Sequence, residues 1–154
     1  MGKMLKILAI NPGSTSTKIA LYENENPVFT KSIFHSADEI KKYDKISDQY
    51  EFRKKVILDA IREHGANLSE INAIVGRGGN MKPVQGGTYK INDAMVEDLK
   101  IGVMGQHASN LGGIIADAIA NELGISSYVV DPVVVDELEA YARVSGMPDI
   151  QRKS

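Results

Sequence analysis

The sequence predicts an α/β fold, in which a mixed sheet opens with an antiparallel three-stranded meander and carries helices on its faces. Two observations support this fold class. Three short apolar runs near the N-terminus are separated by polar turns, which is typical of a β-meander. Farther along, apolar stripes with helical spacing alternate with short runs rich in β-branched residues, which is typical of a sheet covered by helices.

The first half of the chain supplies the meander. We expect strands at residues 5–10, 19–22 and 28–34, followed by a short helix and a connection within residues 38–49. Residues 50–64 carry apolar side chains on one helical face and stop at Gly65, which predicts a helix. An apolar strand is expected at residues 71–75, directly before a glycine-rich turn.

The second half alternates helices and strands. A brief strand is expected at residues 88–91, and then a helix capped by Asp93 that runs to Leu99. A longer helix at residues 111–123 ends at Gly124, and its glycines at 112 and 113 would let a neighbouring segment approach closely. A strand at residues 127–130 precedes Asp131 and Pro132, which predict the start of a last helix reaching about residue 144.

Length and composition narrow the classes of function. The chain of 154 residues suits a single domain, residues 1–154, and its net charge of −2 gives no reason to expect a nucleic acid or an anionic membrane as partner. Without cysteine there is no thiolate metal site, and three scattered histidines do not suggest a metal cage. No apolar run approaches a membrane span and no signal peptide is recognisable, so we expect a cytoplasmic protein.

The polar turn between the first two strands, residues 11–18, is the first candidate site. Small residues, hydroxyl groups and a lysine ammonium together favour binding of phosphate. The alternative is a solvated β-turn without a ligand. The expected phosphate-binding residues are Asn11, Gly13, Ser14, Thr15, Ser16 and Lys18. The spacing differs from that of a Walker A loop, and a strand rather than a helix follows it.

Four polar side chains are expected at strand ends or in glycine-rich turns, where sheet-based folds hold their ligands. They are Asn11, Arg77, His107 and Asp131. We therefore expect them to lie around one cleft.

Five motifs together resemble the acetokinase family, and they cover nearly the whole chain in the family's order. They are residues 11–18 (NPGSTSTK), 75–79 (VGRGG), 86–89 (GGTY), 107–112 (HASNLG) and 130–137 (VDPVVVDE). The resemblance implies the ribonuclease H-like fold of the actin, sugar-kinase and Hsp70 superfamily. It also implies a phosphotransferase reaction in which ATP, with Mg²⁺, and butyrate or a related short-chain fatty acid give ADP and the acyl phosphate.

The resemblance has one large departure, because family members are more than twice as long as this chain. It implies that the chain is equivalent to the N-terminal half, with the acyl side and one phosphate loop. The adenosine pocket and a Mg²⁺-binding glutamate would lie in the other half, so we expect little kinase activity from this polypeptide alone.

The resemblance also implies roles for individual residues. Arg77, His107 and Asp131 match catalytic residues, and Gly78, Gly79 and Arg152 would contact the substrate. A carboxylate nucleophile is already ionised, so the reaction mainly needs cations and hydrogen-bond donors that neutralise charge. Each residue also has a structural alternative: a surface arginine for Arg77, a capping or core histidine for His107, and a helix cap for Asp131.

Two details of recognition stay open at this level. Apolar residues beside the glycine-rich loops are candidates for the acyl-chain pocket, namely Met81, Pro83, Val84 and Tyr89. We expect a fatty acid and a nucleotide as partners, with homo-oligomerisation as an option. The alternative functions are a non-catalytic actin-like assembly module, or an inactive excised domain whose former interface self-associates.

Overall fold

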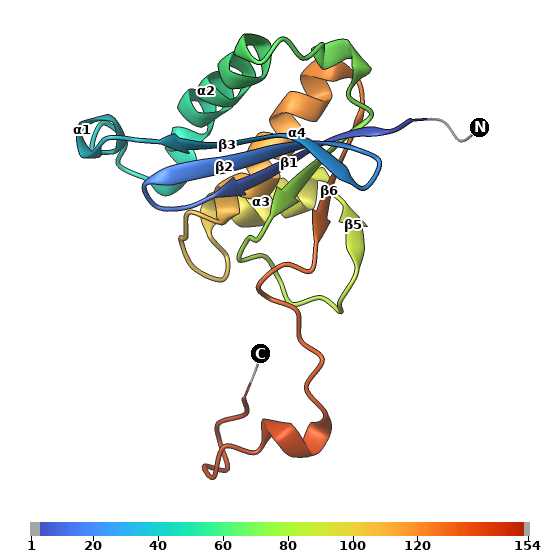
Figure 1. The fold of residues 1–154 in the computed structure, drawn as a ribbon. Helices are drawn as coiled ribbons and strands as arrows, with labels where there is room; N and C mark the ends of the chain where they lie inside the picture. The colour runs from blue at the N-terminus through green and yellow to red at the C-terminus, as the bar shows by residue number, and fades with distance from the viewer. Residues whose placement is uncertain (1–3, 153–154) are drawn as a thin grey trace.

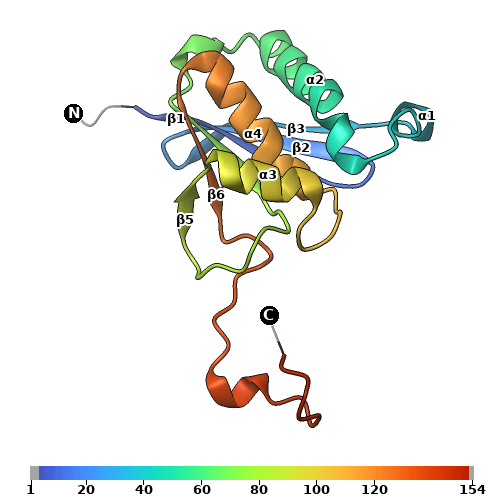
Figure 2. The same ribbon diagram turned by 180° about the vertical axis from the view of Figure 1, so that it is seen from behind.

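A six-stranded mixed sheet with helices packed on it forms the body of the protein. The structure is a computed structural model that describes residues 4–152. The strands lie in the order β3-β2-β1-β4-β6-β5. The three longer helices, α2, α3 and α4, lie on one face of the sheet, behind it in Figure 1 and in front of it in Figure 2. The predicted fold class is confirmed.

The meander consists of β1 (Lys6–Pro12), β2 (Ser16–Glu23) and β3 (Asn26–Phe34), which pair antiparallel. Both strands are longer than predicted, because Asn11 and Pro12 continue β1 at its C-terminal end and polar residues extend β2 at both ends. Side chains alternate between the two faces. Leu8 and Ile10 are buried against the helices, while Asn11 and its partner Lys18 occupy the opposite, open face.

A helical connection leads from the meander to the fourth strand. It contains α1 (Ala37–Ile40), a 3₁₀ turn η1 (Ile46–Gln49), α2 (Tyr50–Glu63) and a second 3₁₀ turn η2 (Leu68–Glu70). The strand β4 (Ala73–Arg77) then pairs parallel with β1. It lies two residues later than predicted, so that its final residue is Arg77.

The second half follows the predicted order up to β6. It contains β5 (Thr88–Lys90), α3 (Asp93–Ile101), α4 (Asn110–Leu123) and β6 (Ser126–Val130). The predicted cap of α3 is wrong by one residue, because the Asn92 side chain accepts the Met95 N–H at 3.0 Å. The predicted end of α4 is confirmed, since Gly124 adopts the left-handed conformation with φ 67°.

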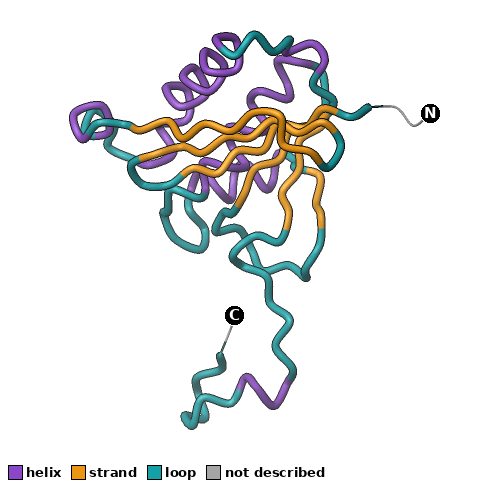
Figure 3. Tube along the Cα trace, viewed as in Figure 1, coloured by secondary structure: helices purple, strands orange, loops and turns teal. Residues whose placement is uncertain are grey.

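The helix predicted after Asp131 is wrong. The chain instead runs away from the sheet as an extended segment that contains one 3₁₀ turn, η3 (Ala140–Arg143), as Figure 3 shows. Val135 forms a parallel bridge with Val84, and the Asp136 N–H donates to the Val84 carbonyl at 2.9 Å. The β-branched residues of this segment thus pair with a neighbouring loop, which competes with helix formation. Within residues 4–152, no helix meets the length and hydropathy that a transmembrane span needs.

Strand β4 and helix α4 make a backbone-to-backbone contact that only glycine permits. A Cβ atom on Gly76 would overlap the carbonyl group of Gly112, and one on Gly112 would overlap the Arg77 carbonyl oxygen. This contact confirms the expectation that the first turn of α4 uses its missing side chains for close packing. It also fixes the start of α4 against the end of β4.

The Gly76→Ala variant is expected to lose about 3 kcal/mol or more of unfolding free energy, because its methyl group overlaps backbone that cannot move aside. Gly13→Ala is the matched control. The nearest atom to its Cβ, the Ser16 carbonyl oxygen, would lie at 3.5 Å, so the loss should stay below about 1 kcal/mol. Urea unfolding monitored by circular dichroism measures the unfolding free energy of both variants. Equal losses would contradict the close-packing interpretation.

Candidate functional site

A hollow of about 490 Å³ lies at the edge of the sheet where β1, β4 and β6 end. It contains the four side chains that the sequence predicted to meet. Its lining residues are Asn11, Pro12, Arg77, Gly78, Asn80, His107, Ser109, Asp131 and Val133.

Sheet topology explains why residues so far apart in sequence meet. Strand β4 pairs parallel with β1 on one side and with β6 on the other. The carboxyl ends of three neighbouring parallel strands therefore share one edge. Asn11 and Arg77 belong to the ends of β1 and β4, and Asp131 directly follows β6. His107 comes from the loop before α4, which the contact between Gly76 and Gly112 holds at the same edge.

The ring of His107 is held through its Nδ1 atom. The Ser109 backbone N–H donates to Nδ1 at 3.2 Å, and the Ser109 hydroxyl lies 2.8 Å from the same atom. Because the backbone N–H can only donate, Nδ1 is the acceptor, and the neutral ring carries its proton on Nε2. The Nε2 atom of His107 is therefore a hydrogen-bond donor.

Asn110 supports the loop that carries His107. Its side chain is buried, accepts the Asn80 N–H at 2.9 Å, and donates to the carbonyls of Leu99 and Gly105 at 3.2 and 3.1 Å. One amide thus joins the segment after β4, the end of α3 and the His107 loop. The sequence alone did not indicate this role, because an asparagine at the start of a helix more often acts as a simple cap.

Asp131 adopts a left-handed conformation with φ 39°, which is uncommon for a residue other than glycine. Its Oδ1 accepts the Gly87 N–H at 2.7 Å, and a Glu137 carboxylate oxygen accepts the neighbouring Gly86 N–H at 2.7 Å. The interpretation of Asp131 as a helix cap is wrong, since no helix follows it. Its carboxylate instead fixes the glycine-rich loop before β5.

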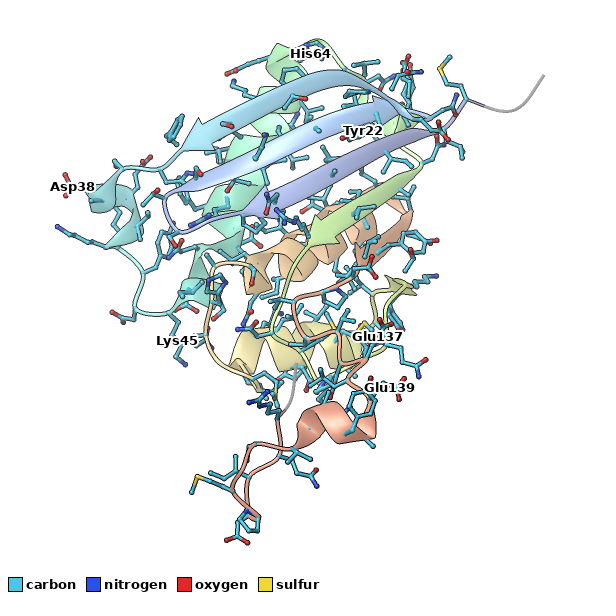
Figure 4. The ribbon with its side chains drawn as sticks, turned by 60° about the horizontal axis from the view of Figure 1, so that its bottom comes forward. Tyr22, Asp38, Lys45, His64, Glu137 and Glu139 are labelled. Carbon is cyan, nitrogen blue, oxygen red and sulfur yellow. The ribbon has the colours of Figure 1, made fainter. Side chains whose placement is uncertain are left out.

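Arg77 is exposed, and in the described part of the chain its side chain forms no hydrogen bond or ion pair. It also borders a second hollow of about 330 Å³ on the open face, which Lys18 and Tyr22 help to line. Figure 4 shows Tyr22 on this face. Lys18 pairs with Asn11 inside the ladder, so it is an exposed residue of β2 and lies outside the turn.

The β1–β2 turn is narrower than predicted and comprises residues 13–15. Its backbone is held from behind by Arg53 of α2, a residue that the sequence analysis did not single out. The Arg53 guanidinium donates to the carbonyls of Gly13 and Ser14 at 2.7 and 3.0 Å, and to Ser16 at 3.3 Å. An arginine among the apolar positions of the helix was the available signal, since the spacing places it on the buried face.

The same buried network includes His35. Arg53 donates to the Thr17 hydroxyl at 3.2 Å, and that hydroxyl lies 2.8 Å from His35 Nε2. Burial lowers the pKa of His35, the positive charge of Arg53 lowers it further, and Glu39 partly opposes the shift. The Thr17 hydroxyl therefore links the Arg53 guanidinium to the His35 ring.

The three residues predicted to contact the substrate, Gly78, Gly79 and Arg152, lie in different parts of the structure. Gly78 lines the hollow with φ 83°, whereas Gly79 packs against Leu99 in the core. Arg152 lies on the segment that leaves the body of the protein, and its N–H donates to the Arg143 carbonyl at 2.8 Å. Of the acyl-pocket candidates, Met81 is buried in the core and Tyr89 packs against it.

Stability should fall as the pH drops below about 6.5. The unfolded chain takes up a proton at His35 near that pH, whereas the folded chain resists it because the pKa is lowered, so the unfolded state gains relative stability. His35→Gln is expected to flatten this dependence between pH of about 7 and about 5. The exposed His64→Gln is the control and should keep it. Urea unfolding at each pH measures the effect, and an unchanged slope in His35→Gln would refute the assignment.

Comparison with known proteins gives close relatives in sequence. No family model matches the chain. It is 60% identical over 151 residues to butyrate kinase 1 of Clostridium acetobutylicum, which covers 98% of this chain and 42% of that protein. It is 59% identical over 149 residues to a probable butyrate kinase of Clostridium botulinum, again with 42% of the relative covered. The chain thus spans less than half the length of these relatives.

Solved structures share the fold at low sequence identity. A propionate kinase from Francisella tularensis superposes with a TM-score of 0.57 at 17% identity, over 95% of this chain and 42% of that one. Acetate kinase from Entamoeba histolytica gives a TM-score of 0.61 at 14% identity, over 94% of this chain and 40% of that chain. The mixed sheet with its antiparallel meander is therefore a fold that this chain shares with these two kinase structures.

Proposed function

We infer that this chain is the N-terminal domain of an acetokinase-family protein, and from that premise we propose that it supplies the acyl and phosphoryl side of a carboxylate kinase. The reaction is ATP with butyrate, or a related short-chain fatty acid, giving ADP and the acyl phosphate. The observation that carries the proposal is the hollow at the sheet edge, which gathers a guanidinium, an imidazole N–H donor, an amide and a carboxylate.

The difficulty of this reaction is electrostatic, because an anionic nucleophile must approach an anionic phosphate chain. Positioned donors and cations lower that repulsion, and no base is needed to activate a carboxylate that is already ionised. Arg77 is suited to this task, since its guanidinium has no partner in residues 4–152 and offers a two-pronged donor. It would hold the fatty-acid carboxylate or the transferring phosphoryl group.

His107 and Asn11 would act as further donors to the phosphoryl group. The contact of Nδ1 with the Ser109 N–H leaves the Nε2 proton available to a phosphoryl oxygen in the transition state. Asn11 lies beside Arg77 in both hollows, where its amide can orient a phosphate or a water molecule. Neither group has to change protonation during the transfer.

Asp131 and the β1–β2 turn would serve the nucleotide. The described residues hold no cluster of three metal-ligating side chains, but Asp131 and Asn11 offer oxygen ligands of the kind that Mg²⁺ prefers while keeping several waters. Bound Mg²⁺ would neutralise charge on the phosphates. The turn residues Gly13, Ser14, Thr15 and Ser16 would contact phosphate oxygens. The adenosine contacts lie outside this chain in the proposal.

The test is a chimera in which this chain replaces the matching segment of C. acetobutylicum butyrate kinase 1, with acyl phosphate trapped by hydroxylamine. Arg77→Ala is expected to lower the rate about 100-fold or more, because it removes a charged donor from the transition state. Arg62→Ala removes an exposed arginine of α2 and should leave the rate unchanged.

The chain by itself is expected to form no acyl phosphate in the same assay. A folded chimera that is inactive with all native residues present, or an Arg77→Ala chimera at full rate, would refute the proposal. An active isolated chain would refute the assignment of the adenosine contacts to another domain.

A further inference from the structure

Arg53 is a buried cation without an anionic partner. Its side chain is 1% exposed, and in the described part of the chain no carboxylate forms an ion pair with it. Burial lowers its pKa to about 10, so it remains charged at neutral pH. A buried charge destabilises a fold unless it is well solvated by other groups. Within residues 4–152, the guanidinium is solvated by oxygen atoms of Gln49, Thr17, Ser16 and the β1–β2 turn.

Every carbonyl of the turn is directed into the protein. Arg53 Nη1 binds the carbonyls of Gly13 and Ser16, and Nη2 binds that of Ser14. The remaining one, of Thr15, accepts the His35 N–H at 2.9 Å. Groups of the protein therefore bind every backbone carbonyl of this turn.

The donors of the same peptide units point the other way. In a trans peptide the C=O and N–H bonds are opposed, and the chain has no cis peptide among its described residues. The N–H groups of Ser14 and Thr15 thus face outward. Both residues are exposed, and neither N–H has an acceptor within residues 4–152. Two successive outward N–H groups form a small anion-binding concavity.

We propose that Arg53 is a positioning residue that turns the β1–β2 loop into a phosphate site. It pulls the carbonyls inward, which aims the Ser14 and Thr15 N–H groups at the ligand. Its unbalanced positive charge lies directly behind those groups and attracts an anion through them. That the anion is a phosphate of a nucleotide rests on the proposed function; the recognition of a phosphate by the loop does not.

The test uses the ¹⁵N-labelled chain titrated with inorganic tripolyphosphate. The largest shifts of amide resonances are expected at Ser14 and Thr15. Arg53→Met should weaken binding about tenfold or more, because both the carbonyl contacts and the charge are lost. Arg53→Lys keeps the charge but lacks the paired N–H donors of the guanidinium, and it is expected to bind with intermediate affinity. If Arg53 had only a structural role, the affinities of the folded variants for tripolyphosphate would not follow the charge at this position.

Two further variants keep the test decisive. Gln49→Leu removes an acceptor that orients the guanidinium while the charge stays in place, so it should weaken binding moderately even if Arg53→Met fails to fold. Arg62→Met, an exposed site on the same helix, changes the net charge equally and should bind as the unmodified chain does.

Folded variants at Arg53 and Gln49 with undiminished affinity would overturn the proposal, as would shifts located away from the turn. This outcome is separate from the kinase assay. A chimera could fail to make acyl phosphate while the turn still binds tripolyphosphate, or transfer phosphate at full rate without Arg53.

Discussion

Parallel pairing of β4 with both β1 and β6 is the constraint on which the site depends. It brings three carboxyl strand ends to one edge and sets their polar residues side by side. The close approach of Gly76 and Gly112 then seats α4 against β4, so the loop before the helix reaches the same edge. An antiparallel arrangement of these strands would have sent Arg77 and Asp131 to opposite ends of the sheet.

The two sides of the site are built on different physical principles. Around the hollow, exposed side chains are aimed by neighbouring backbone, as when the Ser109 N–H fixes the His107 ring. At the β1–β2 turn, the buried Arg53 guanidinium orients the backbone itself by donating hydrogen bonds to its carbonyls. Both devices leave hydrogen-bond donors facing outward, which suits a reaction between two anions.

Burial of a charge and a neutral histidine in one network links this site to stability. Arg53, Thr17 and His35 join α2, β2 and the end of β3 behind the turn. Within residues 4–152 every buried side-chain polar atom has a hydrogen-bond partner, so this network restrains the turn geometry as well as the packing.

The sequence by itself determined the fold class, the order of strands and helices up to β6, and the four residues that meet in the hollow. Apolar periodicity and glycine-ended helices are local signals, and Asn11, Arg77, His107 and Asp131 stood at recognisable strand ends and turns. It failed after Pro132, where pairing with the loop at Val84 overrides a plausible helix start.

Only the tertiary structure decided the roles of Arg53 and Asn110, the placement of Lys18 in the ladder and the burial of Gly79. Each of these depends on contacts between residues far apart in the chain. Local periodicity carries no information about which backbone groups a buried polar side chain will reach.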